Sequence, residues 1–147
     1  VFETASQKEA VRKELLMAIA KQESRFSPGV SSPVGATGLL QLMPATAEEL
    51  AGGTLTIDEL REPTRNARLG ARYLAQLLGQ WQGDIVLAVA SYNAGPGAAS
   101  QWVSPSLRKD PELWVERIPY PETRLYTKKV LGNLWAYLGS GHDRCDS

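Results

Sequence analysis

The feature that most constrains this chain is a four-residue apolar period in its middle. Leu69, Tyr73, Leu77 and Trp81 occupy every fourth position of the stretch from Thr64 to Trp81. This spacing places apolar side chains along one face of a long helix. No segment shows the apolar–polar alternation of a half-buried strand. The sequence therefore predicts an all-α fold.

Capping signals divide the rest of the chain into further helices. Ser6 and Glu9 have the spacing of a capping box and predict a helix from Ser6 to about Ser24. Asp84 is expected to cap a helix from Ile85 to Asn93. Further starts are predicted at Pro44, Thr56, Pro96, Asp110 and Glu122, with stops at Gly52 and, for the last helix over Glu122 to Leu138, at Gly139. The pattern predicts one compact domain of about seven helices.

The predicted domain covers residues 1–147, with a core over about residues 6–139 and a flexible polar tail over residues 140–147. Trp81, Trp114 and Trp135 have helical spacing to other apolar residues and are predicted to be core residues, whereas Trp102 is a candidate to flank a ligand. The segment from Val30 to Met43 has no clear period, and long loops in compact domains are often functional.

Composition excludes several function classes. The chain has 147 residues, which is about one domain. Its 16 Lys and Arg balance 16 Asp and Glu, so there is no basic excess of the kind that nucleic-acid binders carry. No apolar run approaches the length of a membrane span, and no segment has the pattern of a signal peptide.

Cysteine and histidine usage narrows the chemistry. Cys145 and His142 are the single residues of their types, and both lie in the polar tail. An internal disulfide is therefore impossible, and a zinc site would lack ligands. No Gly-rich phosphate loop is present. We expect no metal and no cofactor, and chemistry that depends on carboxylates, hydroxyls, amides and aromatic rings.

Glu23 is the candidate acid. It follows Leu15 and Ile19 at four-residue steps, on the apolar stripe of its helix. Burial raises a carboxyl pKa, and the negative end of the helix dipole acts in the same direction. Such a group suits general acid catalysis. The alternative is a structural glutamate, paired with a distant arginine or capping a loop.

Four segments then carry a resemblance. Residues 23–28 read ESRFSP, residues 32–44 read SPVGATGLLQLMP, residues 90–97 read ASYNAGPG and residues 118–124 read IPYPETR. In this order they resemble the catalytic domain of the soluble lytic transglycosylases, the goose-lysozyme-like enzymes of bacterial cell-wall turnover. The similarity covers roughly residues 15–138 and implies a compact goose-type lysozyme-like fold.

The resemblance implies that Glu23 is the acid and base of a peptidoglycan lytic transglycosylase. Such an enzyme cleaves the β-1,4 bond between N-acetylmuramic acid and N-acetylglucosamine. Glu23 would protonate the bridging oxygen and then take the proton of the muramoyl C6 hydroxyl, which closes a 1,6-anhydro ring. The implied partner is the peptidoglycan glycan strand, and the implied location is the periplasm of the bacterial cell envelope. We expect a monomer.

Further roles follow from the same resemblance. Tyr92 matches a catalytic tyrosine near the acid, although the family commonly has alanine where this chain has Ser91. Residues that match substrate-binding positions are Ser32, Gln41, Met43, Glu122 and Tyr126. Four of these residues have a structural alternative: loop capping for Ser32 and Gln41, core packing for Met43 and Tyr92.

Two other functions remain open. A lysozyme-type hydrolase of the same bond needs a second carboxylate, about 5–9.5 Å from the acid, to act as base or nucleophile. Glu122 is the only carboxylate in the motifs besides Glu23, whereas Asp58, Glu59 and Asp84 have the positions of helix-start residues. The second alternative is a non-catalytic glycan-binding module, which would not require Glu23.

Overall fold

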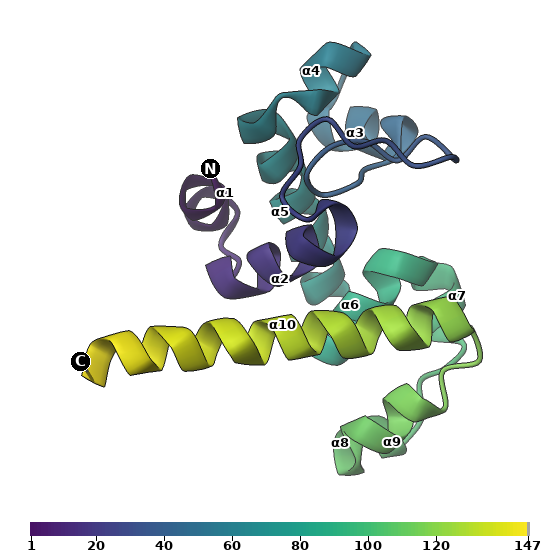
Figure 1. The fold of residues 1–147 in the computed structure, drawn as a ribbon. Coiled ribbons are helices and arrows are strands. Elements are labelled where there is room, and N and C mark those ends of the chain that lie inside the picture. The colour runs from purple at the N-terminus through teal and green to yellow at the C-terminus, as the bar shows by residue number, and fades with distance from the viewer. Residues whose placement is uncertain (147) are drawn as a thin grey trace. The chain divides into compact units, whose positions relative to one another are not determined.

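A computed structural model describes the backbone of residues 1–146 and the side chains of residues 1–139. Ten helices and no strand are found in this part of the chain, which confirms the all-α prediction (Figure 1). In order they are α1 (Phe2–Glu9), α2 (Lys13–Ser24), α3 (Pro44–Ala51), α4 (Ile57–Arg61), α5 (Pro63–Gln80), α6 (Ile85–Ala94), α7 (Pro96–Ser100), α8 (Ser106–Lys109), α9 (Pro111–Glu116) and α10 (Pro121–Asp146).

Two compact units make up the chain. The first comprises residues 1–75, and the second begins at residue 76. In the first unit Leu15, Leu16, Ile19, Leu60 and Leu74 have side chains that are almost wholly buried. In the second, Trp114 and Ile118 belong to a buried cluster to which α6, α7, α8 and α9 all contribute. No helix of the described part combines the length and hydropathy needed to cross a membrane.

The helix predicted from Ser6 to Ser24 is wrong in its boundaries. Two helices occupy this stretch, and they are separated at Ala10, which has a left-handed φ of 58°. Ser6 lies inside α1, where its hydroxyl donates to the Glu3 carbonyl instead of capping a helix. The bend places Val11 in the core, with 8% of its surface exposed. Val11 is thus a core residue directly after the break.

Other capping predictions are confirmed. Thr56 and Glu59 form a reciprocal capping box at the start of α4. The Asp84 side chain accepts a bond from the Leu87 N–H at the start of α6, and Gly52 closes α3 with a positive φ. The predicted stop at Gly139 is wrong, because α10 continues to Asp146. The predicted flexible tail, with His142 and Cys145, concerns side chains outside the described part.

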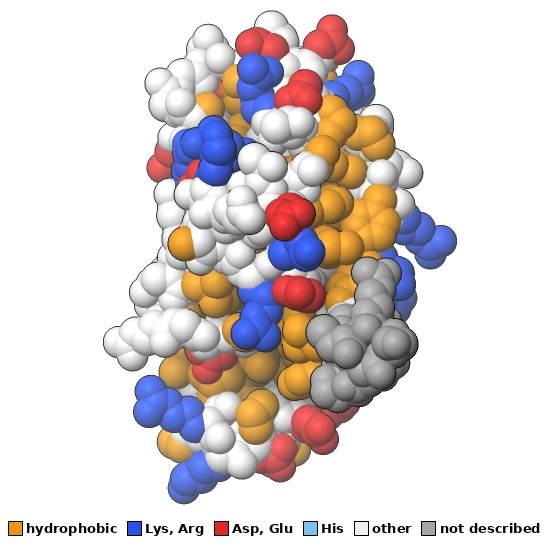
Figure 2. All heavy atoms as spheres, turned by 90° about the vertical axis from the view of Figure 1, so that its left-hand side faces the viewer, with side chains coloured by type: hydrophobic (Ala, Val, Ile, Leu, Met, Phe, Trp, Pro, Cys, Tyr) orange, Lys and Arg blue, Asp and Glu red, His pale blue; other side chains and the backbone are white. Residues whose placement is uncertain are grey.

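The buried face of α10 does not include the predicted core residue of this helix. Val130 and Leu134 are buried, whereas Trp135 is 68% exposed. The prediction that Trp135 is a core residue is therefore wrong, and that for Trp114 is confirmed, with 3% exposed. On the face that Figure 2 shows, side chains of both charge signs are interspersed, in keeping with the balanced composition.

Candidate active site

Glu23 lies in the last turn of α2, one residue before the helix ends at Ser24. Leu15 and Ile19, at four-residue steps before it, are 1% and 0% exposed, so the predicted stripe faces the core of the first unit. Glu23 itself is half-buried at the end of this stripe. Glu23 is thus a partly exposed residue at the end of a buried stripe, and this setting suits a general acid.

Ser24, the residue after Glu23, holds the end of α2, a role that the sequence did not predict. Ser24 is buried, and its hydroxyl lies 2.8 Å from the Leu39 carbonyl and 3.1 Å from the Ala20 carbonyl. Leu39 belongs to the long loop between α2 and α3. The contact therefore attaches the turn that carries Glu23 to that loop.

A strained turn follows α2. Arg25 and Phe26 have φ values of 53° and 64°, in the left-handed region that favours glycine. The Phe26 ring meets the Phe2 ring of α1 edge to face, with centroids 5.7 Å apart. Because left-handed backbone costs ~1–2 kcal/mol per residue, packing such as this contact is needed to hold the turn.

The loop of residues 30–43 has a defined shape. Thr37 and Leu42 exchange backbone hydrogen bonds of 2.9 and 3.0 Å, and the Gly38 N–H donates to the Val30 carbonyl at 2.9 Å. Gly38 has a φ of 83°, and a Cβ on it would lie 2.3 Å from the Asn66 side-chain nitrogen. Only glycine satisfies both conditions at this position.

Asn66 of α5 holds this loop from inside, and it too was missed. The side chain is fully buried, and its oxygen accepts from the Leu40 N–H at 2.8 Å. Its nitrogen donates to the Thr37 and Leu60 carbonyls, each at 2.9 Å. A buried amide that binds three backbone groups positions the loop, and the sequence signal for it was an asparagine among the apolar residues of an amphipathic helix.

Ser32 and Gln41 both bond to the loop backbone. The Ser32 hydroxyl accepts from the Ala36 N–H at 3.0 Å, so its O–H remains a donor. The Gln41 nitrogen donates to the Val30 and Gly38 carbonyls, each at 2.9 Å. Both amide hydrogens are thus engaged, and the oxygen is the Gln41 atom that can accept from a ligand.

Met43 is exposed at the end of the loop. It occupies the N-cap position of α3 and 42% of its surface is accessible. The alternative that Met43 fills the core is therefore not supported. An exposed thioether beside polar loop residues offers an adaptable apolar contact.

The other three predicted site residues lie in the second unit. Tyr92 of α6 and Tyr126 of α10 are 9% and 5% exposed, and Glu122 in the first turn of α10 is exposed. The Asn93 oxygen accepts a 2.7 Å bond from the Thr123 hydroxyl, which joins α6 to the start of α10. Tyr92 directly precedes Asn93 in the sequence, and Glu122 directly precedes Thr123.

Ser91 also has a defined contact. Its hydroxyl accepts a 2.8 Å bond from the Trp81 indole nitrogen, and Ser91 is fully buried. A serine at this position therefore satisfies a tryptophan N–H that an alanine would leave unpaired. The contact involves no atom of Tyr92.

Several carboxylates of the first unit have local partners. Hydrogen bonds from Arg72 and Arg68 lower the pKa of Glu9 below its ordinary value of 4.5. The backbone N–H of Thr56 lowers the pKa of Glu59. The backbone N–H groups of Arg65 and Thr64 lower the pKa of Glu62. The predicted helix-start roles of Glu59 and Asp84 are confirmed by their capping bonds. These carboxylates therefore have structural roles.

Comparison with known proteins gives the class. A family model described as the transglycosylase SLT domain matches residues 1–115. The soluble lytic murein transglycosylase of Salmonella typhimurium is 44% identical over 121 residues, which cover 78% of this chain and 19% of that protein. This chain belongs to the transglycosylase SLT domain family.

Solved structures agree with this assignment. The lytic transglycosylase Slt of Pseudomonas aeruginosa, in an inactive glutamate-to-glutamine variant, is similar over 96% of this chain, with a TM-score of 0.88 and 39% identity. The soluble lytic transglycosylase of Escherichia coli is similar over 90%, with a TM-score of 0.80 and 35% identity. The chain covers 24% and 22% of these two proteins, and thus about a quarter or less of its relatives' length.

Proposed function

We propose that this chain is the catalytic domain of a peptidoglycan lytic transglycosylase, and that Glu23 is its acid and base. The observation that carries the proposal is the setting of Glu23: a half-buried residue whose helix end is attached through Ser24 to the loop of residues 30–43. The family and the inactive glutamate-to-glutamine variant of the Pseudomonas relative support it.

The reaction needs one carboxyl group and two proton transfers. Protonated Glu23 gives its proton to the glycosidic oxygen, and the bond from that oxygen to C1 of N-acetylmuramic acid breaks. The resulting carboxylate removes the proton of the C6 hydroxyl, whose oxygen bonds to C1 and closes the 1,6-anhydro ring. Protons and electrons balance within substrate and enzyme, so no water, metal or cofactor is consumed.

Loop residues are suited to hold the sugar. The Ser32 O–H can donate to an N-acetyl carbonyl, and the Gln41 oxygen can accept from a hydroxyl or N-acetyl N–H. Met43 supplies an exposed apolar surface at the same loop. For Tyr92 we propose a hydroxyl that acts on the acid or the reacting sugar, and for Glu122 and Tyr126 contacts to the substrate.

The substrate implies where the protein works. Peptidoglycan strands as partner place it in the bacterial cell envelope, and we propose the periplasm and a monomeric state. Hydrolysis of the same bond is the competing reaction. Glu122, the other carboxylate of the motifs, is the candidate second carboxylate for that reaction, so the chemical ends of the products decide between the two reactions.

Mass spectrometry of digested sacculi tests the proposal. Fragments should end in 1,6-anhydromuramic acid, one water lighter than hydrolysis products. Glu23→Gln should abolish release of fragments while Glu14→Gln, a matched change on α2, should leave it intact. Reducing muramic ends would replace the proposal with a lysozyme-type activity, and an active Glu23→Gln would remove Glu23 from the mechanism.

A further inference from the structure

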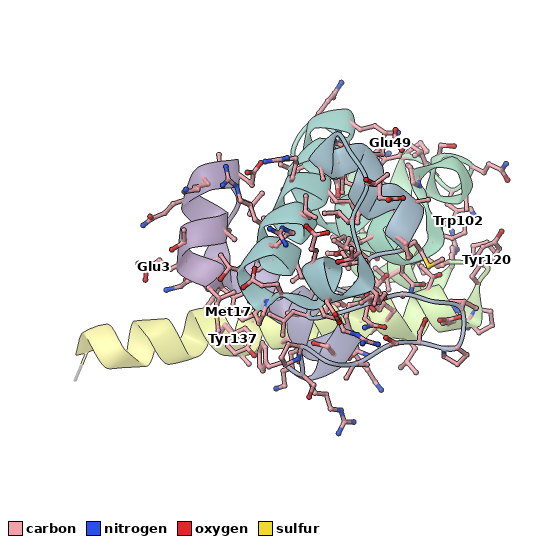
Figure 3. All side chains as sticks on the ribbon, turned by 90° about the horizontal axis from the view of Figure 1, so that it is seen from above. Glu3, Met17, Glu49, Trp102, Tyr120 and Tyr137 are labelled. Atoms are coloured by element: carbon pink, nitrogen blue, oxygen red, sulfur yellow. The ribbon has the colours of Figure 1, made fainter. Side chains whose placement is uncertain are left out.

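Two aromatic rings of the second unit form an exposed corner. The Trp102 and Tyr120 ring centroids are 5.0 Å apart and the ring planes meet at 78° (Figure 3). Tyr120 is 50% exposed, and Trp102 is half-buried. An edge-to-face pair leaves two apolar walls at nearly a right angle, instead of the closed surface of a stack.

The backbone that carries each ring is fixed. The buried Trp114 indole donates to the Trp102 carbonyl at 2.8 Å. The Arg124 guanidinium donates to the Ile118 carbonyl through two nitrogens, at 3.1 and 2.9 Å, two residues before Tyr120. Rigid aromatic groups lose little conformational entropy when they bind a ligand, so an exposed pair with this support suits recognition.

Polar groups lie beside Trp102, one ring of the pair. A hollow of about 230 Å³ beside Trp102 is also lined by Ser104, Ser106 and Arg117. The two serine hydroxyls share a 2.7 Å hydrogen bond that either can donate, so the pair can present a donor or an acceptor to a ligand. Apolar walls beside hydroxyls and a guanidinium match a pyranose ring, which has an apolar C–H face and a polar hydroxyl rim.

The corner also adjoins a residue of the proposed site. Tyr120 precedes Pro121, which begins α10, and Glu122 is exposed in the first turn of that helix. We propose that Trp102 and Tyr120 form a subsite for an amino-sugar ring of the glycan strand, next to Glu122. The proposal rests on the proposed function for its substrate class. The sugar stacks on the aromatic walls and bonds to the polar rim.

Binding in an inactive background isolates this subsite. The 147-residue chain carrying Glu23→Gln is titrated with chitohexaose, a soluble β-1,4 N-acetylglucosamine oligomer, by calorimetry. Adding Tyr120→Ala should weaken binding roughly tenfold, because it removes one aromatic wall. Tyr120→Phe should bind like the parent, since it keeps the ring. Trp135→Ala, which removes another exposed aromatic of this unit, should have no effect.

Further measurements separate stacking from packing. Tyr120→Leu keeps apolar bulk and should weaken binding as Tyr120→Ala does, with thermal melting confirming that both fold. In the active enzyme, Tyr120→Ala should raise KM for sacculi and leave kcat nearly unchanged. Unchanged binding by both Tyr120→Ala and Tyr120→Leu, or an equal loss in Trp135→Ala, would overturn the subsite. If the parent chain proves unable to cleave sacculi, the proposed function fails, while the chitohexaose comparison still decides the subsite.

Discussion

At the scale of single residues, the buried amide of Asn66 holds the loop of residues 30–43. Asn66→Ala removes the side-chain bonds to the Leu40 N–H and to the Leu60 and Thr37 carbonyls, and the Thr37 carbonyl keeps its bond from the Leu42 N–H. Each buried backbone group left without a partner costs ~1–3 kcal/mol, so we expect a loss of about 3 kcal/mol or more in the free energy of unfolding. Urea unfolding measures it. Gln76→Ala, an exposed change on α5, should stay within about 0.5 kcal/mol.

At the same scale, we propose a functional role for Tyr92. Tyr92→Phe keeps the buried ring and removes the hydroxyl, so unfolding should change by only ~0.5–1.5 kcal/mol. We expect most of the rate of sacculi cleavage to be lost, because the hydroxyl is proposed to act on the acid or the sugar. Cleavage per folded molecule is the measurement. A variant that is strongly destabilised yet fully active would show that the tyrosine is structural.

At the scale of elements, two glycines of α5 give opposite expectations. A Cβ on Gly70 would lie 2.4 Å from the Leu40 side chain, whereas a Cβ on Gly79 meets no atom within 4 Å. Alanine is favoured over glycine inside a helix by ~1 kcal/mol, but overpacking costs ~1–3 kcal/mol. Gly79→Ala should therefore raise the melting temperature and Gly70→Ala should lower it. Equal changes in the melting temperature of the two variants would mean that the Leu40 side chain can move to make room for the new Cβ without a loss of stability.

The α1–α5 contact should make stability depend on pH. Arg72 bonds to Glu9 at 3.1 Å and Arg68 at 3.3 Å, which lowers the pKa of Glu9 in the folded state. Because the pKa of Glu9 is lower in the folded state than in the unfolded chain, the ionised carboxylate stabilises the protein at any pH above the unfolded pKa. This stabilisation disappears as the pH falls through the folded pKa. Glu9→Gln should cost about 1 kcal/mol at pH 7, with a difference that closes as pH falls below about 4.5.

Thermal unfolding from pH 7 to pH 2.5 measures this closure. Glu3→Gln is the control, since Glu3 lies on the same helix and is exposed. A difference between wild type and Glu9→Gln that stays constant over the whole range would show that the Glu9 carboxylate contributes no charge-dependent stability.

At the scale of the whole molecule, the balance of charges determines how strongly the protein is attracted to its proposed substrate over long distances. With 16 basic and 16 acidic residues the net charge is zero at pH 7, so long-range steering to an anionic wall is weak. The rate of sacculi cleavage should change less than about threefold between about 50 and about 500 mM NaCl. A steep fall with salt would point to a local basic surface that carries the binding.

The sequence by itself determined the helical class and most helix ends. Four-residue periods and caps such as Thr56 and Asp84 are local signals, because the groups involved lie within one turn of each other. It also identified Glu23 at the end of an apolar stripe, and the motif order indicated the family.

Tertiary contacts decided the rest. The break at Ala10, the inward face of α10 and the exposure of Trp135 depend on which neighbours compete for the core. Ser24 bonds to the Leu39 carbonyl, 15 residues away in the sequence. Asn66 bonds to the Thr37 carbonyl, 29 residues away. No periodicity reports such partners, because a hydrogen bond between distant segments exists only once the chain has folded and water has been excluded from both groups.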